Sequence, residues 1–544
     1  MKKMKTVIQQ FLAQAEKHPQ NVAVLDIQGA YTYDQLNRRS AYLAEQILML
    51  LSREGKQNGR AALLLPRTKD YLTSLLAVLR AGCAAVPMDA EYPAERVRAM
   101  LEDVGCAVCI TTKDREKERT DTPCLFLEDV FPEAEDVPEA DTALDRSDLD
   151  AEGLILYTSG STGKPKGVIH RQKVLNVNPD TMTGVLPLSE STRTLCIAGF
   201  SFIASLIDLT LPLFFGGSVY IANETERKNV DMLWALFGRR RITGMFLPPQ
   251  MYSVMRKLHG PLPLAYVLLS GEKARVEHTA DDPLVYEFYG ASESPAMLMH
   301  RMGEGDARSL GKPCRGISAY LMDEEGQFLK EPSMIGELCV DSPYMAMGYH
   351  GLPEETAKKF ADHPSMPGKR LFHTGDYMAW DENGDLIFHG RKDHMVKVRG
   401  YRVELDEVRR AAARFEGIEE AACVPVQVNG GDPYLLLLHR PGSVPGGAES
   451  VYRRVPAGVH GAGILRASGR PAPERPEQGG FSSPESPGNQ DGRSGLRAAG
   501  NGAGENHLPG VCRNIGNGAG QRDRGLFRVR RHVLKRGGAH QPPE

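Results

Sequence analysis

Residues 61–111 read AALLLPRTKDYLTSLLAVLRAGCAAVPMDAEYPAERVRAMLEDVGCAVCIT and decide the fold class. Short apolar runs, typical of buried strands, alternate with longer stretches whose apolar residues recur every three or four positions, as on amphipathic helices. Strands are expected at 61–66, 84–89 and 107–111, and helices at 70–82 and 95–105. Because β-α-β units place parallel strands side by side with helices on the sheet faces, we expect an α/β fold.

This alternation extends from about residue 22 to 427, but its character changes near Met334, where short strands and turns take over. The segment 381–384, Asp-Glu-Asn-Gly, has the Asn-Gly pair of a hairpin turn. A helix at 404–417 and strands at 421–428 and 433–438 then resemble the start of a small α+β domain. From about 439 the chain is rich in Gly, Arg, Pro and Ser without helical or strand periodicity, so disorder is expected there.

Length and charge narrow the class of protein. A chain of 544 residues exceeds one ordinary core, so two or more domains are expected. A net charge of -3 gives no bulk attraction to nucleic acid or an anionic membrane surface. We therefore expect a small-molecule or protein partner and no nucleic-acid or membrane partner. Since no stretch is long and apolar enough to span a bilayer, we also expect a cytoplasmic location. Cys106 and Cys109 are interpreted as buried reduced thiols rather than a metal or redox site.

The stretch 156–167, LYTSGSTGKPKG, places glycines and hydroxyls ahead of two lysines, directly after an apolar strand. Backbone N–H groups of such a loop can surround phosphate oxygens, while a lysine adds positive charge. The spacing differs from the P-loop, which has four residues between its glycines and Ser or Thr after the lysine. The sequence therefore indicates a nucleotide phosphate site of another kind, and a flexible surface loop is the alternative.

With this loop, further motifs in fixed order give a resemblance to the adenylate-forming enzymes. The other matching stretches are YTYDQL (31–36), VLRAGCAAVPMDAEYPAER (78–96), FYGASES (288–294), GELCV (336–340), LFHTGD (371–376) and GRKDHMVKVRGYRVELDEV (390–408). The chain is most similar to the adenylation domains of nonribosomal peptide synthetases and to D-alanyl carrier-protein ligases. The resemblance implies ATP-dependent activation of a carboxylic acid to an acyl-adenylate, release of pyrophosphate, and transfer to the phosphopantetheine thiol of a carrier protein, with Mg²⁺ as cofactor.

The resemblance also implies a division of the chain. Residues 8–392 form a large domain of layered β-sheets and helices with a small β-barrel-like part. Residues 393–438 begin a small, mobile α+β C-terminal domain that is truncated. Residues 439–544 form the low-complexity tail.

Each matching residue has an implied role. The loop residues that hold the β- and γ-phosphates are Thr158, Ser159, Gly160, Ser161, Thr162, Gly163 and Lys166. Glu293 matches the glutamate that holds Mg²⁺ and, with Thr158 and Lys166, forms the catalytic set. Tyr289, followed by Gly290, matches the aromatic residue that stacks on adenine.

The remaining nucleotide contacts lie further along the chain. Asp376 matches the residue that accepts hydrogen bonds from both ribose hydroxyls, Arg391 a cation near the ribose and phosphate, and Asp393 the hinge of the small domain. Read without the family, Asp376 is equally a turn residue and Glu293 a charge at a helix N-terminus.

The expected substrate pocket departs from amino-acid-activating relatives. Their F-S-F-D-x-S motif supplies an aspartate for the α-ammonium, whereas FSFIASLID (200–208) has Ile203 there. A buried ammonium without a counter-charge is costly, so we expect a fatty, branched, keto or hydroxy acid. The other expected lining positions are Ala204, Ile207, Phe246, Leu268, Ser270, Phe288, Ala296 and Met297. Asp208 leaves an amino acid open as the alternative, because its carboxylate offers another anchor.

The family's second catalytic lysine, in N-G-K-[IV]-D after L-P-x-Y-M-V-P, is absent from the written sequence. Read one nucleotide forward, the codons possible for 455–462 permit FLPEYMVP, and those for 471–480 permit Leu-Pro-Leu and then Lys-Val-Asp. We therefore hypothesise a single-nucleotide frameshift near residues 437–439, the alternative being a genuine low-complexity extension. Loss of the lysine predicts activity lower by about a hundredfold, roughly 3 kcal/mol.

Two other functions remain open at this point. An acyl-CoA ligase would pass the acyl group to free coenzyme A, although AEYPAER (90–96) and MVKVRGYRVE (395–404) favour the peptide-synthetase type. A catalytically impaired remnant would bind ATP without acid-dependent pyrophosphate exchange.

Overall fold

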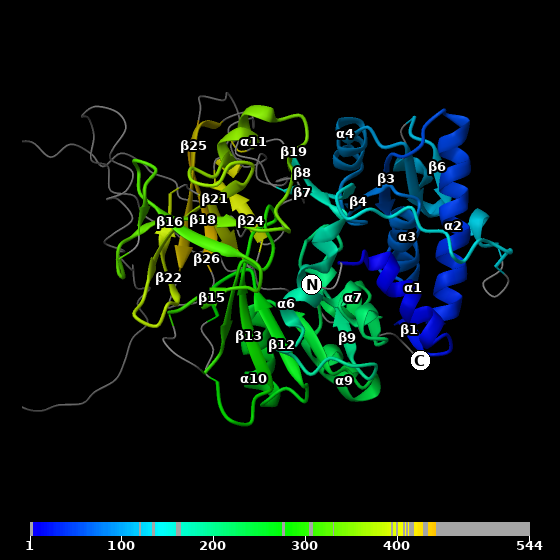
Figure 1. Cartoon of the computed structure of the whole chain (residues 1–544), viewed down its shortest axis with the longest axis horizontal. Coiled ribbons are helices and arrows are strands. Elements are labelled where there is room, and N and C mark those ends of the chain that lie inside the picture. Colours follow the sequence, from blue (N-terminus) through cyan, green and yellow to red (C-terminus); the bar gives the residue numbers. More distant parts are fainter. Residues whose placement is uncertain are drawn as a thin grey trace, which may run out of the picture.

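The fold is described from a computed structural model. The structure describes residues 4–118, 121–132, 137–158, 165–274, 278–303, 308–329, 331–392, 395–398, 401–405, 408–409, 412, 418–427 and 433–441. Three large sheets with helices packed on them make up the molecule up to residue 392 (Figure 1). This arrangement confirms the predicted α/β class of layered sheets and helices.

The first large sheet contains the stretch that decided the fold class. Its strand order is β19-β8-β7-β4-β3-β5-β6. The strands are β3 Arg60–Leu64, β4 Ala84–Met88, β5 Val108–Thr111, β6 Cys124–Phe126, β7 Glu152–Thr158, β8 Lys166–Arg171 and β19 Gly348–Tyr349. Strands β3 to β7 pair in parallel, as the β-α-β rhythm predicts, whereas β8 and β19 are antiparallel to their neighbours.

The second large sheet has nine strands in the order β15-β14-β13-β12-β11-β9-β10-β1-β2. They are β1 Val22–Asp26, β2 Gly29–Thr32, β9 Arg193–Cys196, β10 Ser218–Ile221, β11 Gly244–Leu247, β12 Tyr266–Ser270, β13 Leu284–Tyr289, β14 Leu298–Arg301 and β15 Lys312–Pro313. The central strands are parallel, and β2, β14 and β15 are antiparallel at the two edges. Ligands of such sheets gather at the carboxyl ends of the parallel strands.

The third large sheet is antiparallel and corresponds to the predicted β-barrel-like part. It comprises β16 Ser318–Met322, β17 Phe328–Leu329, β18 Gly336–Asp341, β20 Phe360–Asp362, β21 Arg370–Trp380 and β22 Leu386–Arg391. The predicted hairpin turn joins β21 to β22: the Gly384 N–H donates to the Asp381 carbonyl at 3.1 Å, with Gly384 at φ 75°. Figure 1 shows this sheet on the side of the molecule away from α2 (Tyr33–Arg53) and α3 (Lys69–Arg80).

The helices cover the sheet faces and the space between the sheets. The α-helices are α1 Val7–Lys17, α2 Tyr33–Arg53, α3 Lys69–Arg80, α4 Ala94–Val104, α5 Leu127–Val130, α6 Val177–Met182, α7 Ser205–Thr210, α8 Glu224–Arg227, α9 Val230–Arg239, α10 Pro249–His259 and α11 Pro353–Lys359. Short 3₁₀ helices occupy Lys113–Glu118, Gln172–Asn176 and Pro212–Phe214. Within the described chain, no helix is long and apolar enough to cross a bilayer.

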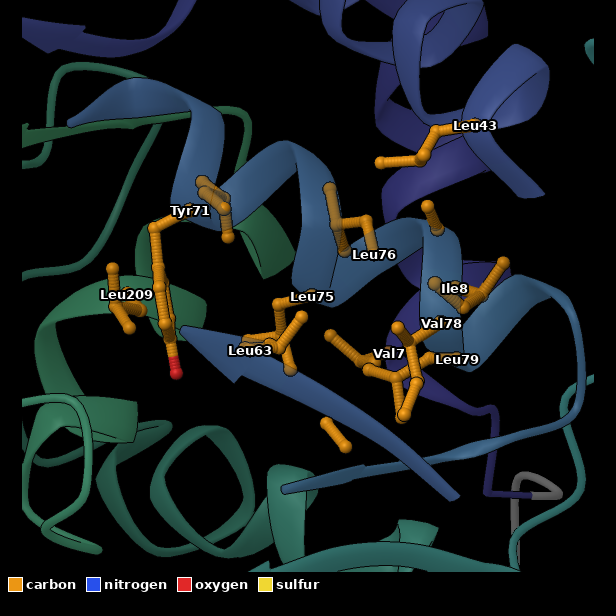
Figure 2. Packing of buried hydrophobic residues seen from close by; sticks show 14 of the residues in the cluster. Val7, Ile8, Leu43, Leu63, Tyr71, Leu75, Leu76, Val78, Leu79 and Leu209 are labelled. Carbon is orange, nitrogen blue, oxygen red and sulfur yellow. The ribbon is translucent and has the colours of Figure 1, made fainter. Parts of the chain in front are cut away.

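Helix α3 lies between the first two sheets and is buried on nearly all sides. It packs against β1 of one sheet and β3 and β4 of the other. Figure 2 shows Tyr71, Leu75 and Leu79 on this helix among Leu63 of β3 and Val7 of α1. Such a helix contributes to stability through both faces, since each fully buried Leu or Val adds about 1.5–3 kcal/mol.

The thiols singled out in the sequence lie in this part of the fold. Cys109 is buried in β5, as expected, whereas Cys106 just precedes the strand and is only partly buried; both thiols are reduced. Burial raises the pKa of the Cys106 thiol to about 12, so it carries its proton at neutral pH.

The chain after residue 392 is described in pieces. Strand β23 (Met395–Val398) pairs with β24 (Tyr401–Glu404), and β25 (Ile418–Gln427) pairs with β26 (Pro433–Pro441). β26 extends beyond the strand predicted at 433–438, because backbone pairing with β25 continues whatever the side-chain pattern. Most of the predicted helix at 404–417 and the tail from 442 lie outside the described residues.

Candidate active site

The Gly-rich loop joins two antiparallel strands. Thr158 ends β7 and Lys166 begins β8, and the two residues pair across the ladder. A strand therefore follows the loop, whereas a helix follows a P-loop, in agreement with the difference in spacing. The loop positions Ser159, Gly160, Ser161, Thr162 and Gly163 lie outside the described residues, as does the predicted hinge, Asp393.

Lys166 contacts residues that lie far from it in the sequence. Its Nζ forms an ion pair with the Glu355 carboxylate on α11 and lies 5.3 Å from the centre of the Tyr349 ring. The Lys166 side chain is only 11% exposed, so these contacts hold the ammonium within the fold.

Glu293 lies in the connection between β13 and β14 and is 2% exposed. Its Oε1 accepts a hydrogen bond from the Tyr349 hydroxyl at 2.8 Å, and its backbone carbonyl accepts one from the Ala346 N–H at 2.8 Å. No helix begins within residues 278–303, so the interpretation of Glu293 as a helix N-terminal charge is wrong. Instead, Tyr349 in β19 and Ala346 just before it hold the side chain and the backbone of Glu293.

Asp376 lies inside β21 and is 6% exposed, so its interpretation as a turn residue is also wrong. The Tyr289 hydroxyl donates to its Oδ2, and Arg391, its cross-strand partner on β22, donates from Nη1 to its Oδ1. Burial, and then the charge of Asp376, raise the pKa of the Tyr289 phenol well above its ordinary value. Both Asp376 oxygens therefore accept hydrogen bonds from groups that keep their protons.

The glycine after Tyr289 is required by close packing. A Cβ on Gly290 would lie 2.8 Å from the backbone nitrogen of Ala296. A larger residue would therefore push apart the chain that carries Tyr289 and Glu293.

Sequence reasoning gave no role to Glu337, although it lies in the GELCV motif. Its Oε1 accepts a hydrogen bond from the Gly375 N–H at 3.0 Å, directly before Asp376. Burial raises the pKa of Glu337, but His373, the Gly375 N–H and Lys392 outweigh burial and lower the pKa to about 2. The position of this acid within GELCV (336–340) was the signal available in the sequence.

Most expected pocket positions come together at the carboxyl ends of β11, β12 and β13. Five lie buried in one apolar cluster: Ile207, Phe246, Leu268, Phe288 and Met297. Ala204 and Ala296 pack against this cluster, and Ser270 ends β12 opposite Phe288 on β13. Ile203 instead packs, with Ala296, against the adjoining cluster around α3.

Asp208 lies beside these apolar positions on α7 and is fully buried. Its Oδ1 accepts the Phe246 N–H at 3.0 Å, whereas its Oδ2 has no hydrogen-bond partner among the described residues. Burial raises the pKa of this carboxyl well above its ordinary value. The fold therefore favours the protonated, neutral form of Asp208.

The profile of the AMP-binding enzyme family matches residues 11–350. The chain belongs to the AMP-binding enzyme family. Lys166, Glu293 and Tyr289 of this family member lie within the matched region, and Asp376 and Arg391 follow it.

Curated relatives of this AMP-binding enzyme are much longer. It is 32% identical to bacitracin synthase 3 of Bacillus licheniformis over 431 residues, which is 77% of this chain and 7% of the relative. It is 31% identical to tyrocidine synthase 2 of Brevibacillus parabrevis over 439 residues, which is 79% of this chain and 12% of the relative. The chain therefore spans a small part of these proteins.

Solved structures share the fold of this AMP-binding enzyme. One is a nonribosomal peptide synthetase protein containing adenylation and PCP domains, with a TM-score of 0.69 and 24% identity over 80% of this chain and 77% of that one. Another is an artificially fused adenylation–PCP di-domain from Klebsiella oxytoca, with a TM-score of 0.71 and 21% identity over 81% and 90% of the two chains.

Proposed function

We propose that the protein is an AMP-forming ligase that activates a carboxylic acid with ATP and passes the acyl group to a carrier-protein thiol. The observation that carries this proposal is that the short segment 289–293 contacts two groups of expected site residues. On one side Tyr289 contacts Asp376, and on the other Glu293 is linked through Tyr349 to Lys166. A ribose acceptor, a metal ligand and a phosphate-binding cation are thus joined over a short stretch of chain.

The chemistry of these groups fits ATP and Mg²⁺. Tyr289 and Arg391 each donate to one oxygen of Asp376 and so orient its carboxylate, and the second lone pair of each oxygen can accept a ribose hydroxyl. Glu293 offers the carboxylate oxygen that Mg²⁺ prefers, and Lys166 offers an ammonium for phosphate. When bound, Mg²⁺ would neutralise phosphate charge, which otherwise repels the incoming carboxylate.

In the proposed reaction, a carboxylate oxygen of the acid attacks the α-phosphorus of ATP. The new bond joins that oxygen to phosphorus, and the bond from the α-phosphorus to the bridging oxygen breaks, releasing pyrophosphate. Lys166 and the loop hold the departing phosphates, while Asp376 and Arg391 orient the ribose. A carrier thiolate then attacks the acyl carbon and displaces AMP.

We propose an acid without an α-ammonium as the substrate. Ile203 offers no counter-charge, and the positions brought together at the strand ends are mainly apolar. The buried Asp208 is favoured in its neutral form and already accepts the Phe246 N–H, which supports the same choice. The division at 393, the cytoplasmic location and the hinge at Asp393 remain predictions from the sequence.

The test is acid-dependent exchange of pyrophosphate into ATP by the full-length chain. Matched panels of fatty, branched, keto, hydroxy and α-amino acids would be compared at equal concentration. We expect stimulation by one of the first four classes, whereas stimulation only by α-amino acids would reject the proposed substrate class. Acyl transfer to a carrier protein but not to coenzyme A is expected next, and the reverse would identify an acyl-CoA ligase. ATP binding without any acid-dependent exchange would indicate the impaired remnant.

A further inference from the structure

Tyr349 touches both sides of the proposed reaction centre. Its hydroxyl donates to Oε1 of Glu293 at 2.8 Å, and its ring centre lies 5.3 Å from Nζ of Lys166. A ring at this distance from an ammonium attracts it by a cation–π interaction. One side chain therefore contacts both the proposed metal ligand and the proposed phosphate-binding lysine.

The surroundings of Tyr349 fix its place. β19 pairs with β8, so Tyr349 lies opposite Val168 of β8. Lys166 is the first residue of β8, two positions before Val168. The Tyr349 N–H donates to Oγ1 of Thr356 at 2.9 Å, and its ring packs edge-on against Phe360 with centroids 5.8 Å apart. Tyr349 as a whole is 6% exposed.

The residue before it allows this close packing. Gly348 has φ 151°, and a Cβ there would lie 2.4 Å from the Thr356 side chain. A glycine at this position therefore lets α11 approach β19, which fixes the direction of the tyrosine.

We propose that Tyr349 is a positioning residue that sets the Glu293 carboxylate for the metal ion and, through its ring, the Lys166 ammonium for the phosphates. The inference rests on the proposed function and adds to it the residue that couples the metal side to the phosphate side. Hydrogen-bonded partners of metal ligands orient them, and removing such a partner lowers metal affinity or activity on the order of tenfold or more.

The two contacts of Tyr349 can be separated by substitution. Tyr349→Phe keeps the ring beside Lys166 and removes only the hydroxyl that holds Glu293. Tyr349→Leu removes the ring as well. The metal-dependent part of ATP binding should therefore fall in both variants, and the metal-independent part only in the second.

The experiment measures ATP affinity of the full-length chain by calorimetry, once with excess chelator and once with saturating Mg²⁺. For Tyr349→Phe we expect the gain in ATP affinity on adding Mg²⁺ to fall about tenfold, with unchanged affinity in chelator. For Tyr349→Leu we expect the same loss of the gain from Mg²⁺. In addition, its ATP affinity in chelator should be about threefold lower than that of wild type.

Tyr344→Phe is the matched control. Tyr344 is also buried in this segment and donates its hydroxyl to a carboxylate, Asp180, at 2.5 Å. Both Phe variants should lower the unfolding temperature similarly, but only Tyr349→Phe should reduce the gain from Mg²⁺. A merely structural role for Tyr349 predicts equal effects of the two variants on ATP binding.

The outcomes also separate this proposal from the proposed function. If Mg²⁺ improves ATP binding equally in wild type and Tyr349→Phe, the role of Tyr349 is rejected and the function stands. If wild type binds ATP with Mg²⁺ but shows no acid-dependent exchange, the function is rejected and the comparison of variants still decides the role of Tyr349. If Mg²⁺ does not affect ATP binding by wild type, both are rejected.

Discussion

At the scale of single residues, the proposed ribose role of Asp376 predicts that its substitution weakens ATP binding. Asp376→Asn keeps one acceptor oxygen but loses the charge, and a hydrogen bond to a charged group contributes about 1.5–3 kcal/mol. ATP affinity should therefore fall roughly thirtyfold, measured by calorimetry with Mg²⁺. Asp385→Asn is the control, because Asp385, in the turn between β21 and β22, accepts the Ser309 hydroxyl. Equal affinities of the two variants would contradict the ribose role.

A second residue-scale prediction concerns pH and Asp208. Its folded-state pKa is raised, so above pH 3.8 the unfolded carboxyl ionises while the folded one keeps its proton. The stability of wild type should therefore decline, relative to Asp208→Asn, as pH rises from about 4 toward 7. Denaturant unfolding of both proteins across this range measures the difference in free energy. A difference that does not change with pH would show that Asp208 is ionised in the fold.

At the scale of elements, the proposed phosphate role of Lys166 predicts competition between helix α11 and the nucleotide. If Lys166 binds phosphate as proposed, its ion pair with Glu355 has to break, and partly exposed pairs contribute about 0.2–1 kcal/mol. Glu355→Gln should therefore tighten ATP binding about threefold, and less so at high salt. The exposed neighbour Glu354 supplies the control variant, Glu354→Gln. Unchanged or weaker ATP binding by Glu355→Gln would argue against competition.

The contacts of Glu337 between strands β18 and β21 should affect how stability changes in acid. The folded-state pKa of Glu337 is lowered from 4.5 to about 2, so its contribution to stability is complete above pH 4.5 and is lost as pH falls toward 2. Glu337→Gln should be less stable than wild type at pH 6, and the gap should narrow between pH 4.5 and 2. Thermal unfolding at a series of pH values measures this gap, and a constant gap would contradict the ion-pair account.

At the scale of the whole molecule, the frameshift hypothesis concerns the end of the chain, from 442 onward outside the described residues. We expect the nucleotide sequence across codons 430–480 to spell Leu-Pro-Glu-Tyr-Met-Val-Pro and Lys-Val-Asp in the shifted frame. Restoring that frame should raise acid-dependent exchange about a hundredfold, because the second lysine returns. If the shifted frame spells neither segment, the tail is native and the hypothesis is rejected.

Local sequence patterns were enough to predict the elements of 61–111 and many residues of the proposed nucleotide site. Apolar periodicity placed the strands and helices of 61–111 within about two residues, and the Asn-Gly pair placed the β21–β22 turn. These features are local, because periodicity and turn chemistry act between residues close in the chain. Ordered motifs then indicated Lys166, Glu293 and Asp376 without their contacts.

How these residues come into contact follows from the packing of the sheets. Tyr349 reaches Glu293 across 56 residues, and Glu355 reaches Lys166 across 189. Such pairs depend on which strands are neighbours in a sheet, as when β19 adds to β8, and local patterns do not specify that order. The raised pKa of Asp208 was equally hidden in the sequence, because a pKa follows from burial and neighbouring groups that exist only once the sheets have packed.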